Sequence, residues 1–283
     1  MYKKFIISIL LILLVFVSSI KIIDDLSTER LDTAFQRSIT VFAIARGLNG
    51  LISVVQGTEV YATPAGVGVN FAVGQILDPL NDMVERFSWV MLMSSVSLGV
   101  QEVMLRLGKT DIVQLLLALS ASVIILMLWV RQLWNKTAFN LVFKGFIIVF
   151  FLRFAVPVIV LLNTAVFNYA LEPKYEKATT ALELTQIESQ TLVKQVQEKK
   201  SENKSWMDSL NISKQIDEFR IELQKLWKSL DEKFSNAIEY MLSLITIFII
   251  ESILFPLFAL WAFMRLFREF LKIDIAKEFQ NSK

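Results

Sequence analysis

The sequence contains no cysteine and no histidine among its 283 residues. Without cysteine, the chain forms no disulfide and carries no thiol nucleophile. Without histidine, it lacks the commonest general base and a principal ligand of zinc, copper and haem iron. These absences argue against most hydrolases and metalloenzymes. We therefore expect a protein that is not an enzyme and that has neither a cofactor nor a metal site.

Neither sign of charge predominates, since 29 basic and 27 acidic residues leave a formal net charge of +2. A chain with so little net charge has no overall field that would recruit nucleic acid. Hydrophobic residues, in contrast, make up 54% of the chain and gather in long runs with basic residues beside them. This composition is typical of an all-α polytopic membrane protein, and we expect about four to six transmembrane helices in a lipid bilayer.

Four apolar segments are the clearest candidates for membrane crossings, namely residues 1–23, 111–130, 138–167 and 237–263. The first begins with lysines and is either a signal peptide or a retained membrane anchor. Its end, VSSIKIIDD, lacks a clear cleavage site of small residues, which favours the anchor.

Two further helices are predicted between Asp25 and Asp111. Apolar residues at spacings of three, four or seven predict a helix over 28–57, and Asp78-Pro79 is a typical start for a second helix that ends near Leu107. Their apolar parts, 38–57 and 86–107, are interfacial, half-inserted, or a fifth and a sixth span.

The segment that joins these two helices has a different periodicity. In VYATPAGVGVNFAV, valine and phenylalanine alternate with small or polar residues after a Pro-Ala-Gly turn. Alternation of this kind predicts a small β-hairpin near residues 58–76.

The only long polar region, residues 172–236, is predicted to be an antiparallel coiled-coil hairpin that turns within KKSENKSWMDSLN. Its second arm carries apolar residues spaced four and three apart, and its first arm carries a weaker seam. The hairpin either pairs its own two arms or associates between subunits. The second-arm residues are Ile212, Ile216, Phe219, Leu223, Leu226 and Leu230, and the first-arm residues are Tyr175, Ala178, Leu182, Thr185, Ser189, Leu192 and Val196.

The chain therefore divides into five predicted segments. These are an N-terminal anchor or signal peptide (1–23), amphipathic helices with the β-hairpin (24–110), two transmembrane helices (111–171), the coiled-coil hairpin (172–236), and a last transmembrane helix with a basic tail (237–283).

The basic residues next to the apolar runs predict the orientation of the chain. Placing them on the cytoplasmic side of a bacterial inner membrane puts segment 24–110 and the hairpin on the extracytoplasmic side. A five-span alternative puts the hairpin in the cytoplasm. The basic residues concerned are Lys3, Lys4, Arg131, Lys136, Arg265, Arg268 and Lys272.

Two ionisable residues interrupt the apolar runs. Arg153 lies within FIIVFFLRFAVPVIVLL and Glu251 lies within TIFIIESILFPLF. Because the hairpin arms pair, we expect the two helices to be neighbours and the two charges to form an ion pair near the middle of the bilayer. Pro157 and Pro256 each free the carbonyl four residues earlier, which adds polar groups there. The pair is either a structural clip or the lining of a path for ions, protons or a polar solute.

Three other basic and acidic residues lie within or beside the apolar helices: Lys144 is a further candidate for the path, and Arg46 and Glu102 are secondary candidates. Lys144 either contributes to the path or extends its ammonium group to the membrane boundary. Arg46 and Glu102 either form a second pair or lie on exposed polar faces of their helices.

An acidic group begins the helix that follows the predicted β-hairpin. Asp78, Asp82 and Glu85 supply oxygen ligands that suit calcium or magnesium. The alternative is helix capping and a favourable interaction with the helix dipole, and the absence of a loop with dedicated ligand spacing favours this alternative.

Two functional hypotheses follow. The first is a homo-oligomeric channel or transport component in which the charged patch lines or gates the path. The alternative is a structural or assembly protein of the membrane, whose hairpin docks a partner protein and whose buried charges only hold helices together.

Overall fold

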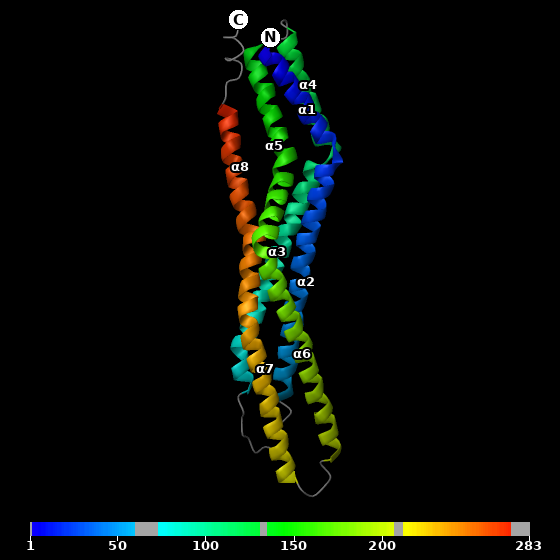
Figure 1. Cartoon of the computed structure of the whole chain (residues 1–283), viewed down its shortest axis with the longest axis vertical. Coiled ribbons are helices and arrows are strands. Elements are labelled where there is room, and N and C mark those ends of the chain that lie inside the picture. Colours follow the sequence, from blue (N-terminus) through cyan, green and yellow to red (C-terminus); the bar gives the residue numbers. More distant parts are fainter. Residues whose placement is uncertain (1, 60–72, 131–134, 207–211, 273–283) are drawn as a thin grey trace. The chain divides into compact units, whose positions relative to one another are not determined.

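The computed structural model describes residues 2–59, 73–130, 135–206 and 212–272, which are almost entirely helical (Figure 1). No strand occurs in these ranges. The helices are α1 (Tyr2–Ser19), α2 (Lys21–Glu59), α3 (Val73–Gly108), α4 (Asp111–Trp129), α5 (Lys136–Val166), α6 (Glu172–Trp206), α7 (Ile212–Ile249) and α8 (Phe255–Lys272), with short π-helical segments η2 (Phe167–Leu171) and η3 (Ile250–Leu254).

Four helices of the described residues are long and apolar enough to cross a membrane, which indicates a multi-pass membrane protein. They cover Asp78–Gly108, Asp111–Trp129, Lys136–Gln195 and Glu232–Lys272. Helices α1 and α2, which meet at a bend of 47°, add a fifth candidate if the pair is counted as one broken span.

The chain forms two compact units. Unit 1 comprises Met1–Phe35, Val96–Tyr169 and Glu251–Lys283, and unit 2 comprises Gln36–Ser95 and Ala170–Ile250. Each unit is built from segments far apart in the sequence, and the predicted segments 24–110 and 237–283 are both divided between the units.

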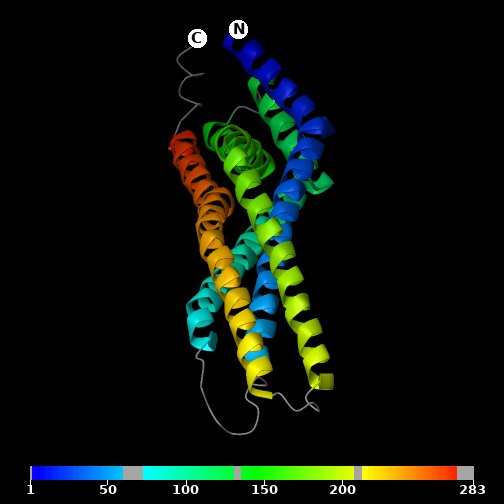
Figure 2. The same ribbon diagram turned by 60° about the horizontal axis from the view of Figure 1, so that its bottom comes forward.

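In unit 1, α1 lies along α4 and α4 lies along α5 (Figures 1 and 2). Side-chain hydrogen bonds join α1 and α4 at both ends. Lys4 Nζ donates to the carbonyl of Leu128 at 2.9 Å, and Gln114 Nε2 donates to Ser19 Oγ at 2.9 Å. Between these bonds lies an apolar core formed by Leu11, Leu117, Ala121, Ile124, Met127, Leu128, Phe139, Phe146 and Ile147.

Helix α5 also packs against α8, with aromatic rings at the contact. Phe151 meets Phe267 edge to face with ring centroids 4.8 Å apart, and Phe263 at 6.2 Å. The start of α5 is fixed by Asn135, whose Oδ1 accepts hydrogen bonds from the backbone N–H of Thr137 and Ala138.

The end of α3 approaches the backbone of α5 closely within unit 1. Gly108 is buried, and a Cβ atom at this position would lie 2.9 Å from the carbonyl oxygen of Leu152. Glycine therefore permits the two helices to meet here. A neighbouring core of Leu31, Leu98, Leu105 and Val160 continues the contact.

In unit 2, α6 and α7 lie side by side as an antiparallel pair (Figure 2). Tyr175 meets Phe248 near one end, and Lys233 forms an ion pair with Glu188 farther along. Helix α2 is joined to α3 by a hydrogen bond between the buried hydroxyls of Ser38 and Ser95, 2.9 Å apart.

The predicted helical hairpin is therefore present, but its coiled-coil seam stays a prediction. In the first arm, Ala178, Leu182 and Ser189 of the predicted seam are buried, but so are Thr179 and Val193 outside it. For the stronger seam, from Ile212 to Leu230, the structure describes the helix but none of the six side chains.

Both π-helical segments end two residues before a proline. Segment η2 ends at Leu171 before Pro173, and η3 ends at Leu254 before Pro256. A proline has no N–H and its ring collides with the carbonyl four residues earlier, so a wider turn accommodates it without ending the helix. Long helices consequently run through both sites.

Two predicted boundaries and one predicted element differ from the structure. Helix α2 begins at Lys21 instead of near 28, because Ser27 and Thr28 do not cap a helix there but donate to the carbonyls of Ile23 and Asp24. Helix α3 begins at Val73, with Pro79 inside it. The β-hairpin is not supported, because its last residues, 73–76, and its first, 58–59, are helical; residues 60–72 lie outside the described ranges.

We predict that Gly108→Ala lowers the free energy of unfolding by about 1–3 kcal/mol, because the added methyl group would press on the α5 backbone. The measurement is thermal unfolding in detergent. Gly145→Ala on α5 is the matched control, since nothing lies within 4 Å of its Cβ position, and it should stabilise the protein slightly or have no effect. Equal behaviour of the two variants would contradict the close approach at Gly108.

Candidate functional site: a buried charge cluster in unit 1

Arg153 forms a buried ion pair with Asp24, which lies just after the start of α2. The Nη1 and Nη2 atoms of Arg153 donate to the two carboxylate oxygens of Asp24 at 2.7 and 2.6 Å. The side chains are only 3% and 10% exposed, respectively. This two-point geometry is the strongest form of an arginine–carboxylate contact.

Ser18 completes the contacts of the guanidinium group. Its Oγ accepts a hydrogen bond from Arg153 Nε at 3.2 Å, and its carbonyl oxygen accepts one from Nη2 at 2.9 Å. This carbonyl is available because α1 ends at Ser19, and the last carbonyls of a helix have no partner within the helix. The break between α1 and α2 therefore supplies acceptors that an unbroken helix would not offer.

Lys109 binds to α2 at the same junction between α1 and α2. Its Nζ donates to the carbonyl of Asp24 at 3.2 Å and to Thr28 Oγ1 at 2.6 Å. Because Lys109 lies in the short connection between α3 and α4, the cluster joins three separate parts of unit 1. These parts are the α1–α2 break, the α3–α4 connection and the middle of α5.

The contacts of the cluster hold helices together. Four hydrogen bonds use the Arg153 donors, and the Asp24 carboxylate receives two of them. Removing one partner of a buried ion pair leaves an uncompensated charge, which typically destabilises a protein by about 3–5 kcal/mol.

The prediction that Arg153 pairs with Glu251 is wrong. The carbonyl of Glu251 instead accepts a hydrogen bond from Asn163 Nδ2 at 2.8 Å. Asn163 follows Arg153 by ten residues on α5, which corresponds to about 15 Å along a helix. The two helices are neighbours, as expected, but their register places Glu251 beside Asn163.

The prediction that Pro256 frees a carbonyl that needs a partner agrees with the structure. The carbonyl of Ser252, four residues before Pro256, accepts hydrogen bonds from Ser97 Oγ at 2.6 Å and Gln101 Nε2 at 3.2 Å. Both donors lie on α3. Glu251 and Ser252 are buried in η3, so this part of unit 1 is a second polar region.

The secondary candidates have local partners or lie at the surface. Glu102 accepts a hydrogen bond from Arg106 Nε at 3.0 Å, one turn along α3, and Arg46 lies over the ring of Phe42 on its own helix. These local contacts agree with the alternative of polar helix faces. Lys144 is exposed on α5.

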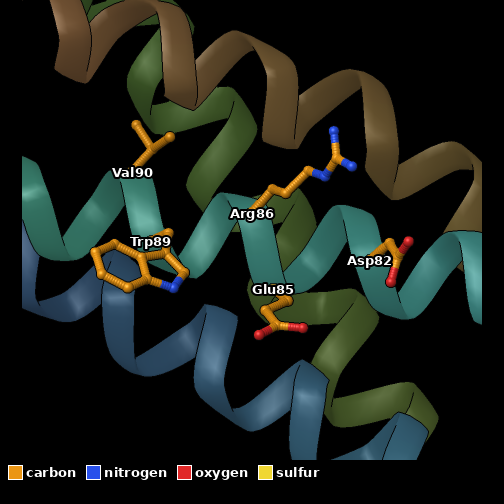
Figure 3. A pocket seen from close by; sticks show the side chains of 5 residues that line it. All are labelled: Asp82, Glu85, Arg86, Trp89 and Val90. Atoms are coloured by element: carbon orange, nitrogen blue, oxygen red, sulfur yellow. The ribbon is translucent and has the colours of Figure 1, made fainter.

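Two acidic residues of α3, Asp82 and Glu85, lie along an open groove (Figure 3). Figure 3 shows Asp82, Glu85 and Arg86 pointing in different directions from α3. Asp78 is also exposed on this helix. Within the part of the chain that the structure describes, no three acidic residues are grouped closely enough to hold a metal ion.

Sequence reasoning missed Asp24, Ser18 and Lys109 because it treated Asp24 as the polar end of an anchor. The sequence did contain a signal for this pair, namely the distance along the chain from a basic residue next to each apolar run. Asp24 follows Lys4 by 20 residues and Arg153 follows Lys136 by 17, so the two distances are similar. However, Glu251 precedes Lys272 by 21 residues, and such counting therefore leaves two candidate partners.

Comparisons with protein-family models, with curated proteins and with solved structures found no match to this chain.

We predict that Arg153→Gln and Asp24→Asn each destabilise the protein by about 3–5 kcal/mol. The exchanged variant Arg153→Asp with Asp24→Arg should recover part of the loss. Folded yield and thermal unfolding in detergent provide the measurement. Glu102→Gln, which breaks an exposed pair within one helix, is the control and should change stability by less than about 1 kcal/mol. Normal stability of both single variants would contradict the interpretation of this ion pair as a structural clip between helices.

A second prediction concerns the carbonyl of Ser252. Ser97→Ala should lower stability by about 1–2 kcal/mol, because a buried acceptor loses a donor. Pro256→Ala supplies a backbone N–H at the position where it is missing, so Ser97→Ala should have a smaller effect in that background. A double-mutant cycle on unfolding free energies measures this coupling. Strictly additive effects would show that Ser97 does not compensate for the proline.

Proposed function

We propose that the protein has a structural or assembly role in a membrane and that the α6–α7 hairpin binds another protein. The role involves no catalysis. Support comes first from the Arg153 cluster, whose donors are taken up by Asp24 and Ser18 in holding three chain segments together. A charge bound in this way is a clip and not a mobile element of a path.

The observation that carries the proposal is an apolar pair on the outer side of α6. Leu184 and Ile187 are 53% and 59% exposed, although the arm that carries them is rich in charged and polar residues. They lie three residues apart and therefore on one helix face. The inner face of the same helix is already buried through Ala178 and Leu182.

An exposed apolar pair on a polar arm suits a contact with another helical surface. The orientation proposed from the basic residues puts the hairpin on the extracytoplasmic side of a bacterial inner membrane. In this proposal the membrane helices hold the hairpin in place and the partner binds beside Leu184 and Ile187.

A channel or transport role, in a homo-oligomer, is the second candidate. It is favoured by the polar region around η3, where Glu251 is 1% exposed within an apolar helix and Ser97, Gln101 and Asn163 converge on backbone carbonyls. Buried ionisable groups in membrane helices often mark pathways. However, this hypothesis expected Arg153 to pair with Glu251, and Arg153 pairs with Asp24.

The test places a photo-crosslinking residue at position 187 in the full-length protein in its native membrane. We expect one adduct of defined mass that contains a second protein. The double substitution Leu184→Glu and Ile187→Asp, with the crosslinker at neighbouring position 191, should abolish that adduct. Thr180→Glu with Gln190→Asp, which adds the same charge at exposed polar positions, is the matched control and should retain it.

Three outcomes decide between the candidates. A single foreign protein in the adduct supports docking. An adduct of twice the chain mass, together with ion flux in liposomes that contain only the purified protein, supports the homo-oligomeric channel. Absence of any adduct, or an adduct that survives the double substitution, would rule out this face of α6 as the docking surface.

A further inference from the structure

The exposed face of α8 changes from apolar to basic within one turn. Side chains at Leu257, Trp261 and Met264 are 59%, 57% and 46% exposed. Arg265 and Arg268 follow on the same face, because residues three or four apart along a helix lie above one another. A surface of this kind fits a ligand that is apolar at one end and negatively charged at the other.

A groove lies at the change from apolar to basic residues. Its volume is about 340 Å³. The residues that line it are Trp261, Met264, Arg265, Arg268, Glu269 and Lys272. The indole of Trp261 forms part of this lining and also lies under the guanidinium of Arg265, 5.8 Å from it. The apolar and charged parts are therefore continuous.

The charges of the groove leave the two arginines as its anion-binding groups. Lys272 Nζ donates to Glu269 Oε1 at 2.7 Å, which neutralises that lysine locally. Arg265 and Arg268 are exposed, and both line the groove. Guanidinium groups bind phosphate oxygens at two points, which an ammonium group does not do.

We propose that this face of α8 binds an anionic phospholipid, with the phosphate on Arg265 and Arg268 and an acyl chain along Met264, Trp261 and Leu257. Two observations favour a lipid over a free phosphate. The apolar half of the face is continuous with the arginines, and α8 ends a segment, Glu232–Lys272, that is long and apolar enough to cross a membrane. A soluble phosphate would leave the apolar half uncovered.

The test uses the full-length protein in nanodiscs of equimolar phosphatidylglycerol and phosphatidylcholine. After the protein has been released from the nanodiscs, native mass spectrometry counts the lipids that stay bound to it. The wild type should retain phosphatidylglycerol in preference to phosphatidylcholine. Arg265→Gln with Arg268→Gln should weaken this retention by about 25-fold, since each basic residue near an anionic surface contributes about fivefold.

Controls separate the site from general charge and from folding. Lys177→Gln with Lys194→Gln removes the same charge from exposed positions on α6 and should leave retention unchanged. The variant Arg265→Lys with Arg268→Lys should retain less phosphatidylglycerol than the wild type but more than the arginine-to-glutamine variant. Trp261→Ala should weaken the retention although the charge is intact. Helical circular dichroism confirms that each variant is folded.

Added glycerol 3-phosphate distinguishes a lipid from a soluble anion and should not displace the bound phosphatidylglycerol. Displacement by that soluble headgroup would overturn the assignment to a lipid. Equal retention of both lipids by the wild type, or undiminished retention in the arginine-to-glutamine variant, would overturn the site itself.

Discussion

The ion pair between Arg153 and Asp24 is the contact on which the arrangement of unit 1 depends. It lies where α1 ends, α2 begins and the α3–α4 connection passes, and it is closed off by Ser18 and Lys109. A buried guanidinium is tolerated only where its donors are matched, and here the broken helix supplies a carbonyl as well as a carboxylate. The bend between α1 and α2 thus provides the acceptors that the charge on α5 needs, and the charge provides donors for the carbonyl left at the bend.

The same principle operates at η3, where a proline takes the place of the helix break. Pro256 removes one backbone donor, and Ser97 and Gln101 on α3 replace it. Polar side chains in unit 1 therefore compensate for breaks in helices: Arg153 at the α1–α2 break, and the two α3 side chains at the proline. This use of polar groups is why we favour a structural role and look for function on the surfaces, at α6 for a protein and at α8 for a lipid.

The sequence predicted the helical architecture well because apolar runs and their polar ends are local signals. The spans now seen as α4 and α5, and the α6–α7 hairpin, lie close to the predicted ranges. The partner of Arg153 was missed because it depends on helix register: the backbone carbonyl of Glu251 accepts a hydrogen bond from Asn163, which follows Arg153 by ten residues. The start of α2 was misplaced because Ser27 and Thr28 are good cap residues that here bind carbonyls inside a longer helix. Register and such choices between local and tertiary partners are set by packing, which a single sequence does not display.

The most direct test of the central claim is solid-state NMR of the full-length protein in lipid bilayers. Arginine side-chain nitrogens would be labelled with ¹⁵N and the carboxyl carbons of aspartate and glutamate with ¹³C, and through-space transfer between them would be recorded. The account predicts transfer from Arg153 to the aspartate carboxyl carbon that disappears in the Asp24→Asn variant. Transfer from Arg153 to the carboxyl carbon of Glu251, or an Arg153 signal unchanged by Asp24→Asn, would contradict it.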